Sequence, residues 1–194
     1  FFLPPMDEDK EITGPLASKL FISSATKDAD LFLVVRLFTP DMKEVTFKGT
    51  VDPHTPIAQG WLRASHRKLD TKKSKPWRPW HTHDKKQPLK PGSVYELDIE
   101  IWPTCVVIPV GYRLALTVRG KDYVYSGEPL NLSNFAHPLD GCGPFLHDDP
   151  RDRPKSVFGG DVTIHTGPNH PSYVMLPVVP PKSAGKKKAA KKKK

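Results

Sequence analysis

The sequence has few cysteines and no long hydrophobic run, and each absence excludes a class of protein. Cys105 and Cys142 are its only cysteines, too few for the disulfide framework of a small secreted domain. No stretch of about 18 apolar residues occurs, so we expect no transmembrane helix and no membrane partner. Cys105 lies in the apolar run Cys-Val-Val-Ile and is predicted to be a buried thiol. A bridge to Cys142 stays an open alternative.

Long helices are poorly compatible with this sequence, because 22 of its 194 residues are proline. Proline lacks the backbone donor that a helix interior needs. Strands separated by Pro- and Gly-containing turns accommodate it, and a chain of this length suits one sandwich domain. The start, FFLPPMDEDK, lacks a basic region followed by an apolar stretch and a cleavage site. We therefore predict no signal peptide, which favours a cytoplasmic location.

The basic character of the chain is concentrated at its end. The net charge is +9, and residues 182–194 carry eight lysines and no acid, so the remainder has a charge of 9 − 8 = +1. A lysine-rich run of this kind is predicted to be a disordered tail. Nucleic acid is not an expected partner, except through non-specific binding to this tail.

Residues 11–38 contain the clearest strand pattern. Leu16, Ser18, Leu20 and Ile22 share one face of a first strand. A second strand, at 31–38, is apolar on both faces and is therefore predicted to lie inside a sandwich.

Further strands are predicted at 44–47, 57–66, 94–101, 112–119, 161–166 and 173–179. In 94–101 every second residue from Tyr95 should face inward, and in 112–119 every second residue from Tyr112. If these two strands are antiparallel neighbours, the acids of the first meet the arginines of the second. Residues 67–92 and 120–160 are predicted to be long irregular loops, with few short helices anywhere.

Several motifs together resemble one known family. They are Ile12-Thr13-Gly14-Pro15, the stretch 23–30 (SSATKDAD), the stretch 60–67 (GWLRASHR) and the stretch 171–177 (PSYVMLP). The chain resembles the C-terminal domain of the X-Pro dipeptidyl-peptidase and cocaine esterase family of serine hydrolases over residues 9–179. The resemblance implies an all-β, jelly-roll, galactose-binding-like sandwich at 11–181, after a lead-in at 1–10 from an upstream domain.

The resemblance also implies that catalysis belongs to other domains. A nucleophile elbow needs G-x-S-x-G, but Val124 stands where the first glycine should precede Ser126. We therefore predict no catalytic residue and no cofactor here. The implied partners are α/β-hydrolase and cap domains upstream in the same polypeptide, with homo-oligomerisation open. The intact enzyme would hydrolyse an ester or amide with a Ser-His-Asp triad, and this domain would shape substrate access.

Two clusters contain metal-ligating residue types, yet neither predicts a metal site. His147, Asp148 and Asp149 precede two arginines, which favours Asp–Arg pairing in a loop. His81 and His83 lie among lysines, which repel a cation, and are interpreted as surface histidines. Residues of the first cluster and three tryptophans are instead candidates for domain docking. These candidates are Trp61, Trp77, Trp80, His147, Asp148 and Arg151.

A free-standing carbohydrate- or polyanion-binding module is the alternative function. Trp77, Trp80 and Trp102 could stack on sugar rings, and a basic loop that carries tryptophans could bind single-stranded nucleic acid. Fold class alone does not decide between these functions.

Overall fold

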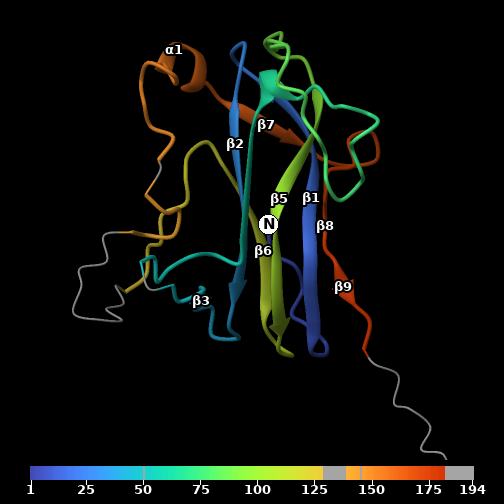
Figure 1. Cartoon of the computed structure of the whole chain (residues 1–194), viewed down its shortest axis with the longest axis vertical. Coiled ribbons are helices and arrows are strands. Elements are labelled where there is room, and N and C mark those ends of the chain that lie inside the picture. The colour runs from blue at the N-terminus through green and yellow to red at the C-terminus, as the bar shows by residue number, and fades with distance from the viewer. Residues whose placement is uncertain (50, 129–138, 145, 182–194) are drawn as a thin grey trace, which may run out of the picture.

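The computed structural model describes residues 1–49, 51–128, 139–144 and 146–181, and it consists of two facing antiparallel sheets (Figure 1). The all-β class and the two-layer arrangement are as predicted. The elements in chain order are β1 (Lys10–Ser24), β2 (Asp30–Phe38), β3 (Glu44–Val45), β4 (Ala58–Arg63), the 3₁₀ turn η1 (Ala64–His66), β5 (Tyr95–Ile108), β6 (Arg113–Arg119), α1 (Lys155–Phe158), β7 (Val162–His165), β8 (Tyr173–Met175) and β9 (Val178–Val179).

The long strand β1 organises the five-stranded sheet. Strand β5 pairs along one edge of β1, from Lys10 opposite Ile108 to Ile22 opposite Tyr95. The short strands β7, β8 and β9 pair with successive parts of β1, whose other edge they occupy. Strand β5 therefore forms an outer edge of this sheet, which is where a strand tolerates the proline at position 103.

Strand β2 organises the four-stranded sheet. Val35 lies opposite Ala58 of β4 on one side and opposite Leu116 of β6 on the other. The two-residue strand β3 pairs with the end of β2. Since β2 has partners on both edges, its row of apolar side chains runs through the middle of the sheet.

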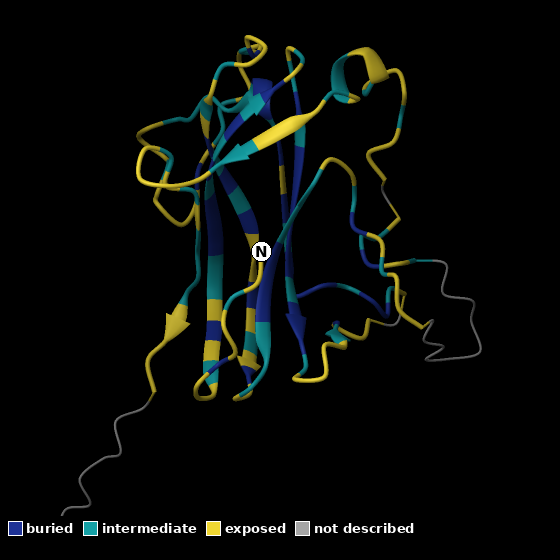
Figure 2. Cartoon of the chain, turned by 180° about the vertical axis from the view of Figure 1, so that it is seen from behind, coloured by how far each residue is buried: buried dark blue, intermediate teal, exposed yellow. Residues whose placement is uncertain are grey.

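The core lies between the two sheets, and the buried residues gather on the long strands (Figure 2). The inward positions predicted for the first two strands are confirmed, because Leu16, Ile22 and Leu33 are fully buried. The same holds for Leu97, Ile99 and Ile101 of β5. The outer face of β2 is buried as well: Phe32 is 4% exposed and Val34 is 1% exposed.

The 94–101 and 112–119 strands are not antiparallel neighbours. Strand β5 pairs with β1 and β6 pairs with β2, so the two strands belong to different sheets. The acids of β5 meet Lys19 of β1 instead, which forms ion pairs with Glu96 and Asp98. Strand β5 is also longer than the predicted 94–101 strand, because it continues through Pro103 to Ile108.

The prediction for Cys105 is wrong too. Its thiol is exposed and lies 3.3 Å from the hydroxyl of Thr13, whereas Thr104 is buried. A register shift explains the exchange: β5 has one residue more than β1 between the Leu16–Ile101 and Gly14–Thr104 pairs, so the inward face passes from the odd positions to Thr104. Cys105 and Cys142 are both free thiols, so no bridge joins them.

The described part of residues 120–160 is mostly irregular and runs beside β2 and β3 (Figure 1). Their single described helix, α1, has four residues. In the part of the chain that the structure describes, no helix is long and apolar enough to cross a membrane. The predicted lysine-rich tail at 182–194 lies outside the described residues.

The two sheets approach most closely where β4 crosses β5, and only glycine fits there. A Cβ added to Gly60 would lie 2.8 Å from the Cα of Ile101 and closer still to the carbonyl oxygen of Glu100. Backbone atoms cannot move aside as a flexible side chain can. Gly60 therefore sets the distance between the sheets at this corner.

We expect Gly60→Ala to lower the free energy of unfolding by about 3 kcal/mol, the upper part of the usual range for overpacking. Urea unfolding followed by circular dichroism would measure it. Gly120→Ala is the matched control, because an added Cβ meets nothing within 4 Å there. Equal stability of the two variants would contradict this account.

Candidate functional site

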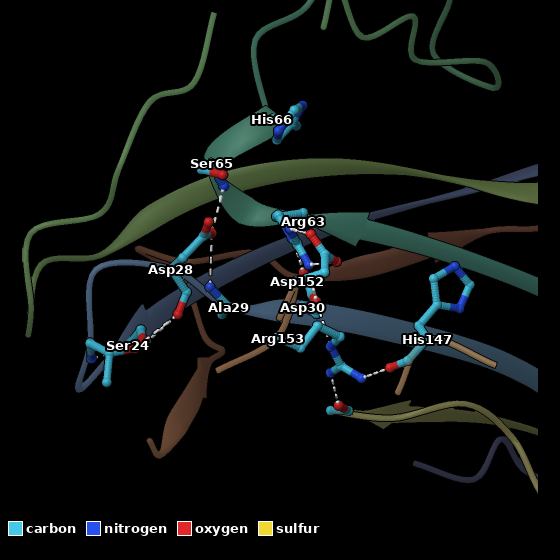
Figure 3. Close-up of polar contacts among 12 residues, drawn as sticks. Ser24, Asp28, Ala29, Asp30, Arg63, Ser65, His66, His147, Asp152 and Arg153 are labelled. Atoms are coloured by element: carbon cyan, nitrogen blue, oxygen red, sulfur yellow. Dashed lines mark hydrogen bonds and ion pairs between the residues drawn. The ribbon is translucent and has the colours of Figure 1, made fainter. Parts of the chain in front are cut away.

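The stretch Ser-Ser-x-x-x-Asp-Ala-Asp forms the β1–β2 turn, and its first aspartate holds that turn to η1, which follows β4 (Figure 3). One carboxylate oxygen of Asp28 accepts hydrogen bonds from the backbone N–H groups of Ala29 and Ser65, both at 2.9 Å. The hydroxyl of Ser24 donates to the carbonyl of Asp28 at 3.4 Å. These bonds give the motif a structural role.

The second aspartate of the motif, Asp30, binds two arginines. Arg63, opposite it on β4, donates from Nε and Nη2 to the two carboxylate oxygens at 2.8 and 3.0 Å. Arg153, just before α1, donates from Nε at 2.8 Å. The Asp30 side chain is 8% exposed and that of Arg153 is 12% exposed. A bidentate pair in so sheltered a position fixes geometry strongly.

Both arginines have further partners, which tie the 120–160 segment to the sheet. Arg63 also donates to both carboxylate oxygens of Asp152, at 2.9 and 2.7 Å. Arg153 donates to the carbonyls of His147 and Gly120. The hydrogen bonds that Arg63 donates to the two carboxylates, first Asp30 and then Asp152, raise its pKa. The bond from Arg63 lowers the pKa of Asp152, so the Arg63–Asp152 pair is ionic at neutral pH.

Aromatic rings surround this ionic network on the outer face of β2 and β4. The ring of His147 lies 5.4 Å from Phe32 and 5.8 Å from Trp61, between centroids. The Trp61 indole also contacts Trp102 of β5, with centroids 5.1 Å apart. Trp61 is 40% exposed and Trp102 is 61% exposed, so the two indoles form an apolar patch open to solvent.

A cavity of about 420 Å³ opens beside this patch. The imidazole of His147 at its edge is oriented by Asp122, which lies 2.9 Å from Nδ1 and also accepts the backbone N–H of His147 at 2.7 Å. Within the described ranges, no group of three His, Cys, Asp or Glu side chains is placed to hold a metal ion. The cavity is lined by Asp30, Leu31, Phe32, Trp61, Leu62, Arg63, His66, His83, His147 and Asp152.

The structure brings together only two of the six predicted docking residues. Trp61 and His147 are in contact, whereas Trp77 and Trp80 lie in the 67–92 loop, 49% and 44% exposed. Lys73 and Arg78 lie over the Trp80 ring, at 5.3 and 5.8 Å from its centroid.

The remaining two docking candidates, Asp148 and Arg151, are exposed. Arg151 binds Asp149 at 2.7 Å, as the predicted loop pairing requires. Sequence reasoning missed the central role of Asp30, Arg63 and Arg153. The two aspartates were visible in the motif, but nothing in the sequence links Asp30 to a residue 123 positions away.

The two histidines of the 81–83 stretch face different partners. His81 contacts the carbonyl of Asp98 at 3.0 Å, and burial lowers its pKa. His83 instead meets His66, with their Nδ1 atoms 3.2 Å apart. Burial and then the charge of His83 lower the pKa of His66.

Comparison with known proteins decides the family. A family model described as the X-Pro dipeptidyl-peptidase C-terminal non-catalytic domain matches residues 1–175. The chain belongs to this family. The resemblance inferred from the motifs is therefore confirmed.

Relatives of this X-Pro dipeptidyl-peptidase C-terminal domain are parts of longer proteins. It is 28% identical over 182 residues to candidate serine esterases of Mycobacterium bovis and Mycobacterium tuberculosis, covering 91% of this chain and 23% of theirs. Cocaine esterase of a Rhodococcus species is 20% identical over 169 residues, with 87% and 23% covered. A CocE/NonD family hydrolase from Staphylococcus aureus has a TM-score of 0.74 at 27% identity, covering 92% of this chain and 30% of that one.

We expect Asp30→Ala to destabilise the chain by about 3 kcal/mol, because it leaves two sheltered guanidinium groups without their shared carboxylate. Because Arg63 still has Asp152 as a partner, the expected loss of stability is at the lower end of the range for a broken buried ion pair. Thermal and urea unfolding would measure it.

Asp152→Ala is the control, since its side chain is 64% exposed and such pairs contribute at most about 1 kcal/mol. If Asp152→Ala proved as costly as Asp30→Ala, Asp30 would not be the centre of the network.

Proposed function

We propose that this chain is the non-catalytic C-terminal domain of a serine hydrolase that cleaves an ester or amide through a Ser-His-Asp triad in upstream domains. The observation that carries the proposal is the exposed Trp61–Trp102 pair on a family-matched domain that spans 23% of its esterase relatives. The names of those relatives support an acyl-transfer hydrolase. Two adjacent exposed indoles are an apolar surface that another domain can cover.

The proposed docking face has the composition of a protein–protein contact. Tryptophan and arginine are enriched among residues that contribute most to such contacts. Here Trp61, Trp102 and His147 stand beside the Arg63–Asp152 pair, with charges mostly neutralised around them. A neighbouring domain could bury the indoles without also burying an unpaired charge. His147, held by Asp122, would then be available at the edge of the buried area.

Placed beside a hydrolase domain, this face would also border the route by which substrate enters. The 67–92 loop and the 120–160 segment both reach the cavity next to Trp61, through His83 and His147. A rigid wall at that point would limit the size of an acyl group or peptide that enters. This role in substrate access rests on the proposed domain arrangement.

The isolated 194-residue chain is expected to hydrolyse neither p-nitrophenyl esters nor X-Pro p-nitroanilides. The reason is that the proposed nucleophile and its elbow belong to another domain. Release of nitrophenol or nitroaniline would be followed by absorbance. Turnover that a serine-directed fluorophosphonate abolishes would overturn the proposal.

In a longer protein that includes the upstream hydrolase region, Trp61→Ala should weaken domain docking. We expect a separate, earlier unfolding transition in calorimetry and a fall in kcat/KM of about tenfold, since a buried interface tryptophan is worth about 2 kcal/mol or more. In the isolated chain the same variant should keep nearly its full stability, because Trp61 is half exposed there.

Tyr173→Ala provides the matched control. Tyr173 is 45% exposed and lies on β8 in the other sheet, so both readouts should stay unchanged. Equal effects of the two substitutions would argue against a docking face at Trp61.

The alternative, a free-standing sugar- or polyanion-binding module, has less support. The Trp61 and Trp102 planes meet at 50°, which does not offer the flat platform that stacks on a sugar. Lys73 and Arg78 occupy the Trp80 ring in the basic loop. Calorimetric titration with glycans and single-stranded oligonucleotides should therefore give no saturable heat.

A further inference from the structure

Two histidines outside the proposed docking patch face each other through ring nitrogens. His66 ends the η1 turn after β4, and His83 lies in the 67–92 loop. Their Nδ1 atoms are 3.2 Å apart, with ring centroids at 5.4 Å. His66 is half-buried next to Ser65, at the edge of the polar network (Figure 3), and His83 is exposed. The pair is accessible to solutes because both side chains line the same open cavity.

The backbone around His83 holds this ring in place. The residue has φ of 52°, a left-handed conformation that a non-glycine residue adopts only when its surroundings favour it. Its neighbour Thr82 donates from its backbone N–H to the carbonyl of Lys68 at 3.0 Å, and Lys68 binds Asp84 at 2.7 Å. On the other side His81 is held by the carbonyl of Asp98. The loop therefore presents His83 to His66 in one orientation.

The separation of the two nitrogens matches that of two ligands on one metal ion. Imidazole nitrogens about 2.1 Å from an ion lie about 3.0 Å apart at a right angle and about 3.4 Å apart at the tetrahedral angle. The observed 3.2 Å falls between these values. A hydrogen bond between two neutral rings would satisfy the same distance, so the experiment must separate the two.

The geometry points to His66 and His83 as a two-histidine site for a divalent transition-metal ion, with its open coordination positions facing the cavity. Imidazole suits copper, nickel and zinc, whereas calcium and magnesium prefer oxygen ligands. The neighbouring carboxylates of Asp30 and Asp152 are engaged by Arg63, which leaves water or a small exogenous ligand to complete the coordination.

The surrounding charges limit the strength of this site. Lys86 and Arg63 act on His66 with positive charge, and Asp28 opposes them. We therefore expect weak binding in the order Cu²⁺, Ni²⁺, Co²⁺, as the general affinity order for divalent metals predicts. Ca²⁺ and Mg²⁺ should not bind there.

Calorimetric titration of the tag-free, EDTA-treated chain with NiCl₂ and CuCl₂ tests the site. His66→Ala and His83→Ala should each weaken binding by about tenfold or more, because each removes one of the two protein ligands. His170→Ala is the matched control: the His165 and His170 rings also lie 5.4 Å apart, but His165 Nε2 is held by Ser23 at 2.9 Å. Its affinity should equal that of the unchanged chain.

A second measurement does not depend on the variants folding. In the unchanged chain, substoichiometric Ni²⁺ should selectively broaden the imidazole resonances of His66 and His83 in a ¹H–¹⁵N spectrum. Absence of saturable binding, broadening centred on other histidines, or unchanged affinity in the folded double variant would each overturn the inference.

Discussion

The carboxylate of Asp30 is the interaction on which the outer side of this molecule depends. It receives one guanidinium from β4 and a second from the segment that precedes α1. Because the bonds to Arg63 are bidentate, they fix the end of β4 against β2, where the register already places the two residues opposite each other. Arg153 in turn donates hydrogen bonds to the carbonyls of His147 and Gly120, which fixes these two residues relative to Asp30. One buried acid thus positions the segment that brings His147 to the aromatic patch.

This arrangement explains why β2 is apolar on both faces. Its inner face belongs to the core between the sheets, while its outer face is covered by the described parts of residues 120–160. Arg153 lies 5.3 Å above the Phe32 ring, and Tyr123 is almost fully buried and donates to Glu44 at 2.9 Å. Burial raises the pKa of Tyr123, so its hydroxyl keeps the proton that it donates. The irregular segment therefore acts as a third layer over the sheet.

The local pattern of apolar residues predicted which face of a strand is buried, but not which strands pair. Alternation identified the inward side of β1, β2 and β5, because side-chain direction is a local property of a strand. It could not identify the partner of β5, since pairing depends on residues far apart in the chain. Cys105 was misassigned for a related reason: an irregularity in the pairing with β1 adds one residue to β5 between Ile101 and Thr104, which reverses the faces beyond it. Among the docking candidates, Trp61 and His147 come together, yet Trp102 joined them only through the crossing of β4 and β5 at Gly60.

The backbone around Trp61 is rigid, and this limits the kind of partner that the exposed tryptophans can bind. Trp61 follows Gly60, whose backbone lies against β5, and it precedes Leu62 and the doubly bonded Arg63. Its position is thus set on both sides before any partner arrives. A preorganised aromatic group loses little conformational entropy on burial, which favours a constant partner surface over varied ligands. The His66–His83 pair lies at a cavity with room for a small ligand, so these two neighbouring places suit different kinds of binding.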